Sequence, residues 1–454
     1  MSFPPYPEYK DSGVEWLGEV PAHWQSKRLK FLFDIQKRGV REEDQIVTCF
    51  RDGMVTLRKN RRSEGFTNAL QEIGYQGIRS GDLVIHAMDA FAGAIGVSDS
   101  DGKSSPVYSV CVPVSPDVSP YYYARLLRHM ALSGFVASLA KGIRERSTDF
   151  RWTDAAEIFL PVPTADEQVK ITRFLDHETT RIDALVKEQQ RLIELLKEKR
   201  QAVISHAVTK GLDPDVPLKD SGVEWLGAVP AHWEVGRVKN VASFITSGPR
   251  GWSDYLTESG EEIFVQSGDL DDHIGVNFEN AKRIRSPMGA EGARTRINCG
   301  DVLVCITGAN TGRVAVSDLP PVSAFINQHL SLVRLNQVNA LPEFVGYALS
   351  SESIQSFFRV EQYGLKEGLS LSDVADAPLV LPPKYEQELV MKYLKDQTQR
   401  LDRLAIDAER SVELLQERRS ALISAAVTGK IDVRGWQQPA GLLAPAETTQ
   451  TEAV

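Results

Sequence analysis

Two segments of the chain repeat apolar residues at seven-residue steps. One spans residues 166–210 and contains no Gly or Pro, and the other spans residues 386–428. Apolar residues at this spacing form a narrow seam along one side of an α-helix, which is typical of a coiled coil. Leu185 and Leu192 are expected to add a second seam to the first helix. The principal seam residues are Leu175, Ile182, Leu196 and Val203 in the first segment, with Gln189 interrupting, and Leu394, Leu401, Ala408, Leu415 and Leu422 in the second.

The two predicted helices align with each other without a gap, from 166–168 with 385–387 to 207–209 with 426–428. Each has about 40–45 residues and is about 60–65 Å long at 1.5 Å per residue. Helices of this length rarely lie alone, and their seams are too narrow to be buried in a globular core. We therefore expect them to pack against each other, antiparallel, within one chain. An intermolecular coiled coil is the alternative.

A stretch of fifteen residues occurs twice and differs at one position. Residues 10–24 read KDSGVEWLGEVPAHW and residues 219–233 read KDSGVEWLGAVPAHW, so that only Glu19 and Ala228 differ. This agreement indicates an internal duplication. The glycines and the proline exclude a regular helix, and the Val, Leu and Trp residues are too apolar for a flexible spacer. We expect each copy of this repeated box to pack against another part of the chain. The alternative is a linker that was copied with its domain.

The order of these segments predicts a closed arrangement. The first helix ends near the second box, and an antiparallel second helix returns to the first box. Residues 10–24 should then pack near 425–431, in the way that residues 219–233 pack near 207–212. The predicted fold class is α+β, with two similar α/β domains joined by two long antiparallel coiled-coil helices in a pseudo-two-fold, circular arrangement.

The regions that precede the helices are mixed in pattern and similar to each other. Short apolar runs such as QIVTCF and DLVIHAM are separated by Gly and Asp turns, which indicates strands, and residues 121–140 have helical spacing with a Gly break. Residues 78–99 align with residues 297–318 without a gap, each with a strand, a glycine-bearing loop and a second strand that ends in Val-Ser-Asp. We expect two related domains whose loops suit different targets.

These patterns divide the chain into seven segments. They are an N-terminal docking box (1–24), a first domain (25–163), a first long helix (164–211), a linker with the second box (212–233), a second domain (234–383), a second long helix (384–430) and a C-terminal tail (431–454). The end of the tail, QQPAGLLAPAETTQTEAV, is rich in Pro, Ala and Thr, so we expect the tail to be disordered.

Composition favours a cytoplasmic protein. The chain has 454 residues, enough for two or three domains, and is 42% hydrophobic and 25% charged. No apolar run is long enough for a transmembrane helix, and the N-terminal residues lack the pattern of a secretory signal. The four cysteines have no CxxC spacing, so we expect reduced, buried thiols and no structural zinc. They are Cys49, Cys111, Cys299 and Cys305.

The net charge of −9 argues weakly against nucleic-acid binding. The charge is unevenly distributed: residues 25–163 contain 19 Lys and Arg against 16 Asp and Glu, whereas residues 234–383 contain 12 against 18. An acidic protein can still present a basic face, or share its DNA with basic partners. The charge therefore weakens a DNA-binding hypothesis without excluding it.

The sequence contains no recognisable catalytic constellation. FPPY at 3–6 is close to a motif of amino-methyltransferases, but Phe3 occupies the position that must accept a hydrogen bond from the target amine. GANTGR at 308–313 lacks the spacing and the Lys-Ser/Thr of a P-loop. The histidines are scattered, and we expect His23 and His232 of the two boxes to be structural.

Basic and polar runs interrupt the apolar pattern of both domains. Lys and Arg neutralise phosphates, and Arg, Asn, Gln and Thr can read base edges. Any single run is more often a solvated surface, but RKNRR at 58–62 places like charges side by side, which is unfavourable unless an anion is bound. The candidate DNA-binding residues are Lys37, Arg38, Arg41, Arg51, Arg58, Lys59, Arg61, Arg62, Arg144 and Arg146 in the first domain, and Arg250, Trp252, Arg283, Arg285, Arg294, Arg296, Asn310, Thr311, Arg313, Gln328 and Lys366 in the second.

The whole pattern resembles the specificity subunits of type I restriction-modification systems. The resemblance rests on the repeated box at the head of each half, on LPVPTADEQ and LPPKYEQ at the entry to each helix, and on RQAVIS and RSALIS near the helix ends. It covers nearly the whole chain. It implies that each domain is a target-recognition domain that reads one half of a split, asymmetric DNA site, with the helices as a ruler.

The resemblance also implies partners. Two modification subunits would carry S-adenosylmethionine and methylate adenine N6, and restriction subunits would use ATP and Mg²⁺ to translocate and cleave double-stranded DNA. This chain would hold no cofactor, metal or catalytic residue. The alternative function is a non-enzymatic scaffold or adaptor that uses the helices and boxes to bind proteins, without sequence-specific contact with DNA. A stand-alone modification enzyme is disfavoured by the missing motifs.

Overall fold

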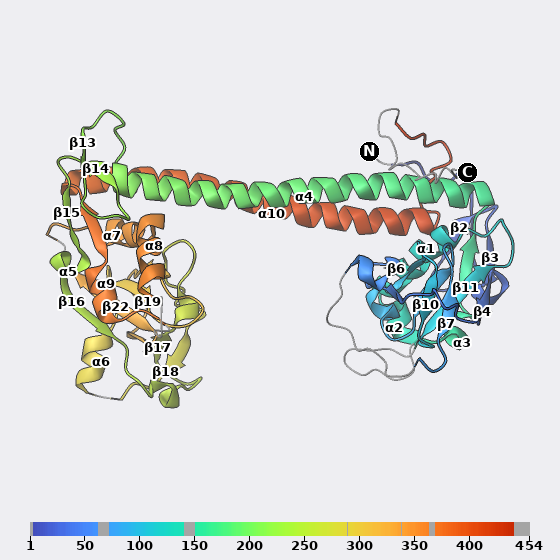
Figure 1. Ribbon diagram of the computed structural model, residues 1–454, viewed down its shortest axis with the longest axis horizontal. Helices are drawn as coiled ribbons and strands as arrows, with labels where there is room; N and C mark the ends of the chain where they lie inside the picture. Colours follow the sequence, from blue (N-terminus) through green and yellow to red (C-terminus); the bar gives the residue numbers. More distant parts are fainter. Residues whose placement is uncertain are drawn as a thin grey trace. The chain divides into compact units, whose positions relative to one another are not determined.

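The computed structural model describes residues 3–61, 72–139, 150–287, 289–336, 338–362 and 368–439. The chain divides into two compact units. The first unit is Met1–Gln189 with Arg410–Val454, and the second unit is Gln190–Glu409. Each unit combines a domain of strands and short helices with a part of both long helices (Figure 1). The predicted α+β class with two domains and two long helices is therefore confirmed.

The domain of the first unit is built on a four-stranded antiparallel sheet. Its strand order is β4 (Phe33–Gln36), β11 (Tyr108–Pro113), β8 (Leu83–His86) and β9 (Ile95–Val97). Leu83 and Ile85 join the core that contains helix α1 (Pro120–Leu132), whereas Val84 joins a second core. Because successive strand residues point to opposite faces, both faces of the sheet are buried. Further elements are the strand pairs β3 (Gln25–Arg28) with β12 (Phe159–Val162), β5 (Val47–Cys49) with β6 (Val55–Leu57) and β7 (Gln76–Ile78) with β10 (Gly102–Ser104), the helices α2 (Phe135–Leu139) and α3 (Trp152–Ala155), and 3₁₀ turns at Leu29–Phe31, Arg58–Asn60 and Ala90–Ala92.

The helical segment after β11 begins after a capping serine and is interrupted at a glycine. The Ser119 side chain accepts from the Tyr122 N–H, and Pro120 occupies the first turn, where its missing N–H costs nothing. Gly134 adopts a φ of +85° between α1 and α2. The predicted helix with a glycine break is confirmed.

The second unit repeats the four-stranded sheet. Its order is β16 (Ala242–Ser247), β22 (Leu330–Leu335), β19 (Val302–Cys305) and β20 (Val314–Val316), again antiparallel. β8 and β9 correspond to β19 and β20, as the alignment of 78–99 with 297–318 predicts. Further elements are the strand pair β15 (Glu234–Arg237) with β23 (Pro378–Leu381), the three-stranded sheet of β18 (Lys282–Ile284), β17 (Glu262–Val265) and β21 (Ala324–Ile326), the helices α5 (Val238–Val241), α6 (Ala290–Thr295), α7 (Pro342–Ser350), α8 (Glu352–Glu361) and α9 (Leu371–Asp376), and 3₁₀ turns at Trp252–Tyr255 and Ser267–Asp269.

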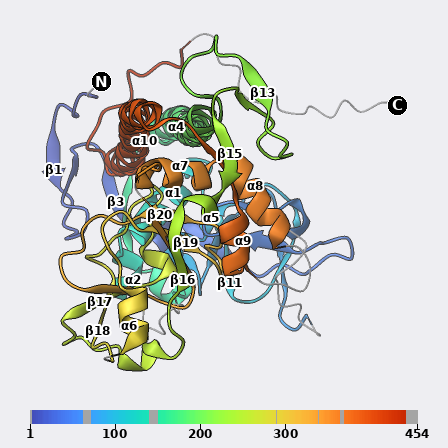
Figure 2. The ribbon, with the colours of Figure 1, turned by 90° about the vertical axis from the view of Figure 1, so that its left-hand side faces the viewer.

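The long helices α4 (Ala165–Lys210) and α10 (Lys384–Val427) pack antiparallel, and one ion pair occurs twice between them. Arg419 Nε lies 2.8 Å from Asp183 Oδ1 in the first unit, and Arg200 Nε lies 3.1 Å from Asp402 Oδ1 in the second unit. In the gap-free alignment Arg200 corresponds to Arg419 and Asp183 to Asp402. Each arginine therefore pairs with the aspartate of the other repeat, and one antiparallel register satisfies both pairs. Figure 2 views the two helices nearly end-on. The predicted pairing within one chain is confirmed.

The principal seam of the helices consists of the predicted residues, but the second seam of the first helix consists of different residues from those predicted. Leu185 and Leu192 are 37% and 42% exposed, so the predicted second seam is wrong. Val186 and Ile193, one residue later, are half-buried instead. A heptad alternates steps of three and four residues, and apolar residues occupy both candidate positions, so the pattern alone did not select the line. Of the principal seam residues, Leu175, Ile182, Leu196, Leu394, Leu401, Ala408 and Leu422 are buried, and Val203 and Leu415 are half-buried.

The first box packs on the end of α10. Its strands β1 (Tyr9–Asp11) and β2 (Glu19–Pro21) form a hairpin, and the Tyr9 hydroxyl donates to the Gly429 carbonyl at 3.1 Å. Trp24 is fully buried in one core with Val427. Gly429 has a φ of +75°, and a Cβ there would lie 2.5 Å from Pro21. The predicted contact of residues 10–24 with the end of the second helix is confirmed.

The second box makes the equivalent contact with the end of α4. Its strands β13 (Leu218–Asp220) and β14 (Ala228–Pro230) form a matching hairpin. Trp233 and Val229 are buried in one core with Ala207 and Val208, and the Lys210 ammonium donates to the Ala228 carbonyl. The predicted position of residues 219–233 is also confirmed.

An adjacent Glu and Gln at the start of each long helix hold a box and a domain. Glu167 accepts from His23 Nε2 at 2.9 Å and from Trp24 Nε1 at 3.3 Å. Gln168 accepts from the Ser119 N–H at 2.8 Å, at the start of α1. The second unit repeats both contacts, with Glu386 bonded to His232 and Trp233 at 2.8 Å each and Gln387 bonded to the Leu341 N–H at 2.8 Å. His23 and His232 are thus structural, as expected.

The beginning of the C-terminal tail is ordered, contrary to the prediction for 431–454. The Trp436 ring packs edge-on against Phe174 with centroids 5.6 Å apart, and Val433 is 1% exposed. The Asp432 N–H donates to the Pro4 carbonyl at 2.7 Å. The expectation of disorder overlooked Val433 and Trp436, which have apolar partners in this unit. The rest of the tail, from 440, lies outside the described residues.

Within the described ranges, no helix combines the length and the apolar character that a membrane span requires.

Candidate nucleic-acid interface

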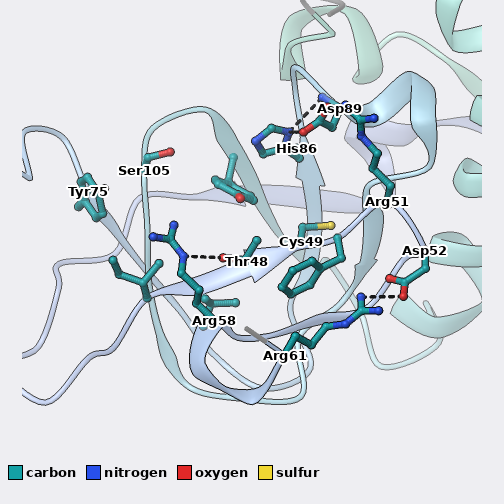
Figure 3. A pocket seen from close by; sticks show the side chains of 14 residues that line it. Thr48, Cys49, Arg51, Asp52, Arg58, Arg61, Tyr75, His86, Asp89 and Ser105 are labelled. Carbon is teal, nitrogen blue, oxygen red and sulfur yellow. Dashed lines mark hydrogen bonds and ion pairs between the residues drawn. The ribbon is translucent and has the colours of Figure 1, made fainter. Parts of the chain in front are cut away.

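Two cavities in the domain of the first unit meet at a pair of tyrosines. One has a volume of about 920 Å³ and the other about 850 Å³, and Tyr75 and Tyr108 line both. We call the larger one the Arg58 cavity and the smaller one the Lys37 cavity. Figure 3 shows the Arg58 cavity. The two cavities share this wall in a domain that was predicted to bind DNA, and together we call them the hollow of the first domain.

Several predicted DNA-binding residues of the first domain line this hollow. Lys37 and Arg38 line the Lys37 cavity, and Arg51, Arg58 and Arg61 line the Arg58 cavity. They come from the end of β4, the turn after β5 and the 3₁₀ turn after β6. The fold thus gathers basic residues that are separated in the sequence.

Two arginines of the Arg58 cavity form ion pairs at the surface. Arg51 pairs with Asp89 at 2.8 Å, and Arg61 pairs with Asp52 at 2.7 Å. Both pairs are solvent-exposed, and such pairs contribute little free energy. Arg58 Nε donates to the Thr48 hydroxyl at 3.3 Å. The Arg51 and Arg61 guanidinium groups of the cavity are therefore held by ion pairs that contribute little free energy.

Other predicted residues of the first domain lie in different surroundings. Arg38 is held by a two-pronged ion pair with the buried Asp82, so a structural role competes with DNA binding at this position. Arg41 pairs with Asp101 at 3.4 Å on the surface, and Lys59 is exposed. Arg62, Arg144 and Arg146 of the first domain, and Lys366 of the second, lie outside the described residues.

His86 is a residue of the Arg58 cavity that the sequence analysis did not select. It ends β8, and its Nδ1 accepts from the Asp89 N–H at 3.0 Å. Its ring packs edge-on against Tyr108 with centroids 4.5 Å apart. Burial lowers the pKa of His86, and Arg51 lowers it further, against the opposing effect of the Asp89 carboxylate. His86 could have been selected from the sequence by its position, because it lies just before the loop that aligns with GANTGR of the second domain.

In the second unit, that equivalent loop lines a cavity of about 380 Å³. Asn310, Thr311 and Arg313 line it together with Arg200 and Arg359. Arg313 donates to the Leu270 carbonyl at 3.0 Å through Nη1, and Nη2 lies 3.2 Å from the exposed Asp272 carboxylate. Three of the predicted residues of the second domain are thus adjacent.

The remaining candidate arginines of the second domain are exposed, but Trp252 is not. The Trp252 ring is 3% exposed and packs against Phe264 and Phe325 in a small core. The prediction that Trp252 contacts DNA is contradicted for this conformation, because the ring fills an apolar core and cannot reach a base. The exposed arginines lie near β18 and α6 or after β16, and are Arg250, Arg283, Arg285, Arg294 and Arg296.

Gln328 belongs to a half-buried polar chain. Its Nε2 lies 3.1 Å from His329 Nε2, and His329 Nδ1 contacts the Thr307 hydroxyl. Among the described residues the buried Gln328 Oε1 has no hydrogen-bond partner. Thr307 follows β19 and lies next to the loop with Asn310, whereas Gln328 and His329 lie directly before β22.

The four cysteines differ in their exposure. Cys49, Cys111 and Cys305 are buried, as expected, whereas Cys299 is exposed, contrary to the expectation. Burial raises the pKa of Cys305. In the described ranges no group of His, Cys, Asp and Glu is arranged to hold a metal ion.

The loop between the two aligned strands of each domain is the point at which the domains differ most in chemistry. In the first unit His86 and Asp89 lie there, and in the second unit Cys305 and Gly308 occupy the same aligned positions. Asn310 and Arg313 correspond to Phe91 and Ala94. The two domains each contain a sheet of the same topology, but their loops differ in chemistry. Such domains are suited to bind two different targets.

The sequence is similar to those of two type I specificity subunits. It is 21% identical over 285 residues to the type I restriction enzyme EcoBI specificity subunit of Escherichia coli, covering 61% of this chain and 59% of the relative. It is 23% identical over 322 residues to the EcoKI specificity subunit of Escherichia coli strain K12, covering 66% of each. The chain thus matches less than two thirds of the length of these curated relatives. No protein-family model matches it.

Solved structures agree with the fold. A chain from a study of complex assembly and conformational transition of the type I R-M system has a TM-score of 0.68 at 16% identity, covering 91% of this chain and 99% of that one. The HsdS subunit from Thermoanaerobacter tengcongensis has a TM-score of 0.53 at 17% identity, covering 91% and 98%. Sequence and fold therefore identify the same resemblance as the repeated box and helix-entry motifs.

Proposed function

We propose that this chain is the DNA-recognition subunit of a type I restriction-modification complex, in which each domain binds one half of a bipartite, asymmetric site. The observation that carries the proposal is the duplicated sheet with unlike loops. β4, β11, β8 and β9 recur as β16, β22, β19 and β20, yet the loop after β8 and the loop after β19 differ in chemistry. Identical domains would favour a palindrome, whereas unlike domains favour unlike half-sites.

The basic residues around these loops support a role in DNA binding. Arg51, Arg58 and Arg61 line one cavity, and Asn310 and Arg313 line another. Guanidinium groups bind phosphate and guanine, and amides bind adenine. The overall negative charge is compatible with this function when other subunits supply part of the phosphate contacts.

The chemistry of methylation and cleavage belongs, in this proposal, to partner subunits. Two modification subunits would bind S-adenosylmethionine and methylate adenine N6, and restriction subunits would use ATP and Mg²⁺. This chain would contribute specificity and no catalytic group, and the complex would act on double-stranded DNA in the cytoplasm. The boxes and the long helices would determine how the two domains are held for the two half-sites.

A selection from random duplex DNA tests the proposal. The purified complex of this chain with its modification subunit should enrich one split motif, with two defined parts separated by a spacer of constant length. A scaffold that does not contact DNA would give no enrichment, and that result would reject the proposal. Replacing the modification subunit alone should leave the enriched motif unchanged, because the specificity resides in this chain.

A further inference from the structure

We propose that His86 determines specificity in the first half-site by donating a hydrogen bond to the major-groove edge of a guanine in the Arg58 cavity. This inference rests on the proposed function and assigns one base contact within it. It goes beyond the arginine-rich runs, because His86 lies in an apolar strand and carries no fixed charge.

The position of the His86 ring is set by contacts on two sides. The Asp89 N–H donates to Nδ1 at 3.0 Å, and the Tyr108 ring packs edge-on against the imidazole. Arg51 in turn holds the Asp89 carboxylate at 2.8 Å. Figure 3 shows the ring at the cavity wall, with Asp89 on one side and the open cavity on the other. A base-reading side chain needs this kind of support from its neighbours.

The same contacts determine which nitrogen carries the proton. Nδ1 lies 3.0 Å from the Asp89 backbone nitrogen and 3.3 Å from the Asp89 Oδ2. Because the backbone N–H can only donate and is the nearer group, we assign Nδ1 as its acceptor, which places the proton of the neutral ring on Nε2. Burial lowers the pKa of His86, which favours the neutral ring. His86 therefore offers one hydrogen-bond donor, Nε2–H, and no positive charge that would attract a phosphate.

The single donor of His86 excludes cytosine, and Arg58 favours guanine over adenine. Cytosine presents only a donor in the major groove, so it cannot accept from His86. Arg58 lines the same cavity, and a guanidinium group has donors only. One donor from each residue would match the N7 and O6 acceptors of guanine, whereas adenine offers one acceptor and one donor. The carboxylates of Asp52 and Asp89 already accept from Arg61 and Arg51.

The second unit lacks an equivalent group. Cys305 occupies the aligned position, and its buried thiol donates to the Thr307 carbonyl at 3.4 Å. The contact by His86 should therefore affect the first half-site alone.

Selection from random duplex DNA by the full complex measures this contact. With the unaltered chain we expect one guanine of one half-site to depend on His86. His86→Phe keeps a ring beside Tyr108 but removes the donor, and should lower the preference for that guanine about ten- to a hundredfold, the usual cost of one mismatched base pair. His86→Gln restores an N–H near the Nε2 position and should retain most of the preference.

A matched control is His129→Phe. His129 is a half-buried histidine of the same unit, on α1, and burial lowers its pKa as well. This variant should leave both half-sites unchanged at the level of single bases. A thermal melt of each variant reports whether it is folded.

A modified duplex tests the contact without altering the protein. Replacing the guanine of the enriched site by 7-deazaguanine removes N7 and should weaken binding about tenfold or more. Unchanged motifs for His86→Phe, a change in the other half-site, or full affinity for every 7-deazaguanine duplex would each overturn the role of His86. An unaltered complex that enriches no motif would instead contradict the proposed function itself.

Discussion

At the scale of single residues, the equivalent carboxylates Glu167 and Glu386 show how one contact can differ between the two repeats. Each accepts from a Trp and a His of its box. The Glu167 side chain is 5% exposed, whereas the Glu386 side chain is 21% exposed. Burial opposes ionisation of Glu167, but hydrogen bonds from His23, Thr164 and Trp24 outweigh it and lower its pKa.

The difference in burial predicts unequal effects on stability. Glu167→Ala should lower the free energy of unfolding by about 1–3 kcal/mol, because the buried Trp24 N–H is left without an acceptor. Glu386→Ala should cost less, since water can reach the groups that it leaves. Denaturant unfolding of both variants is the measurement, and a larger decrease for Glu386→Ala would contradict the explanation.

The lowered pKa values of two histidines also predict how stability depends on pH. His86 and His129 have pKa values lowered from 6.5, so between 6.5 and the lowered value the unfolded chain binds more protons than the folded one. Stability should therefore fall as the pH drops below about 6.5. The charged groups that act on His86 are Asp89 and Arg51, and burial outweighs the carboxylate.

The variant His86→Phe provides the comparison for this dependence. It removes one of the two histidines, so its stability should fall less steeply than that of the unaltered chain in the same pH range. Chemical unfolding at a series of pH values measures both slopes. Parallel slopes for the two proteins would show that His86 does not contribute.

Arg58 and Arg61 should contribute to DNA binding through charge. Their alanine variants should weaken binding by the complex and reduce the salt slope by about one for each phosphate that is no longer neutralised. A contact with guanine would additionally relax the preference for one base. Titrations at several salt concentrations separate these effects, and unaltered affinity and slope would exclude both residues. Arg62 belongs to the same prediction but lies outside the described residues.

At the scale of elements, the long helices were the most predictable part of the fold. Their seven-residue period extends over many turns. The period occurs in both segments, and the two segments align without a gap. The short strands were predictable chiefly by comparison of 78–99 with 297–318. The cavities were not predictable, because Tyr75, His86 and Tyr108 are brought together by strand pairing that no local pattern encodes. The role of Trp252 was predicted wrongly because an aromatic residue two positions after an arginine suits a core as well as a surface.

The second seam of α4 offers a test with neighbouring residues. Val186 packs against the core of the first unit, whereas Leu185 is 37% exposed. Val186→Ser should lower the free energy of unfolding by about 1–2 kcal/mol, and Leu185→Ser should change it by less than about 0.5 kcal/mol. Unfolding curves of the two variants give the comparison. A larger decrease for Leu185→Ser would restore the seam that the sequence pattern predicted.

At the scale of the whole molecule, the duplication predicts that the long helices determine the spacer of the DNA site. Removing residues 187–193 from α4 and 409–415 from α10 would keep the Arg–Asp pair of each unit and leave equal numbers of residues between the two pairs on both helices. Removing both stretches deletes one heptad from each helix, about 10 Å, and preserves the seam. The spacer should shorten by about three base pairs at 3.4 Å each, with both half-sequences unchanged.

The position of methylated adenines in the DNA of cells that carry this variant reports the spacer. An unchanged spacer would contradict the role of the helices as a ruler, even if DNA recognition itself holds. Loss of all methylation would require the melt of the purified variant to distinguish unfolding from loss of assembly.

The central claim is that one chain reads two unlike half-sites. Long-read sequencing of DNA from cells that express this chain with its modification subunit measures it directly, by mapping N6-methyladenine. We predict one split, asymmetric motif, with methylated adenine in each half and a spacer of fixed length. A genome without any new methylated motif, or with an unsplit or palindromic one, would contradict the account.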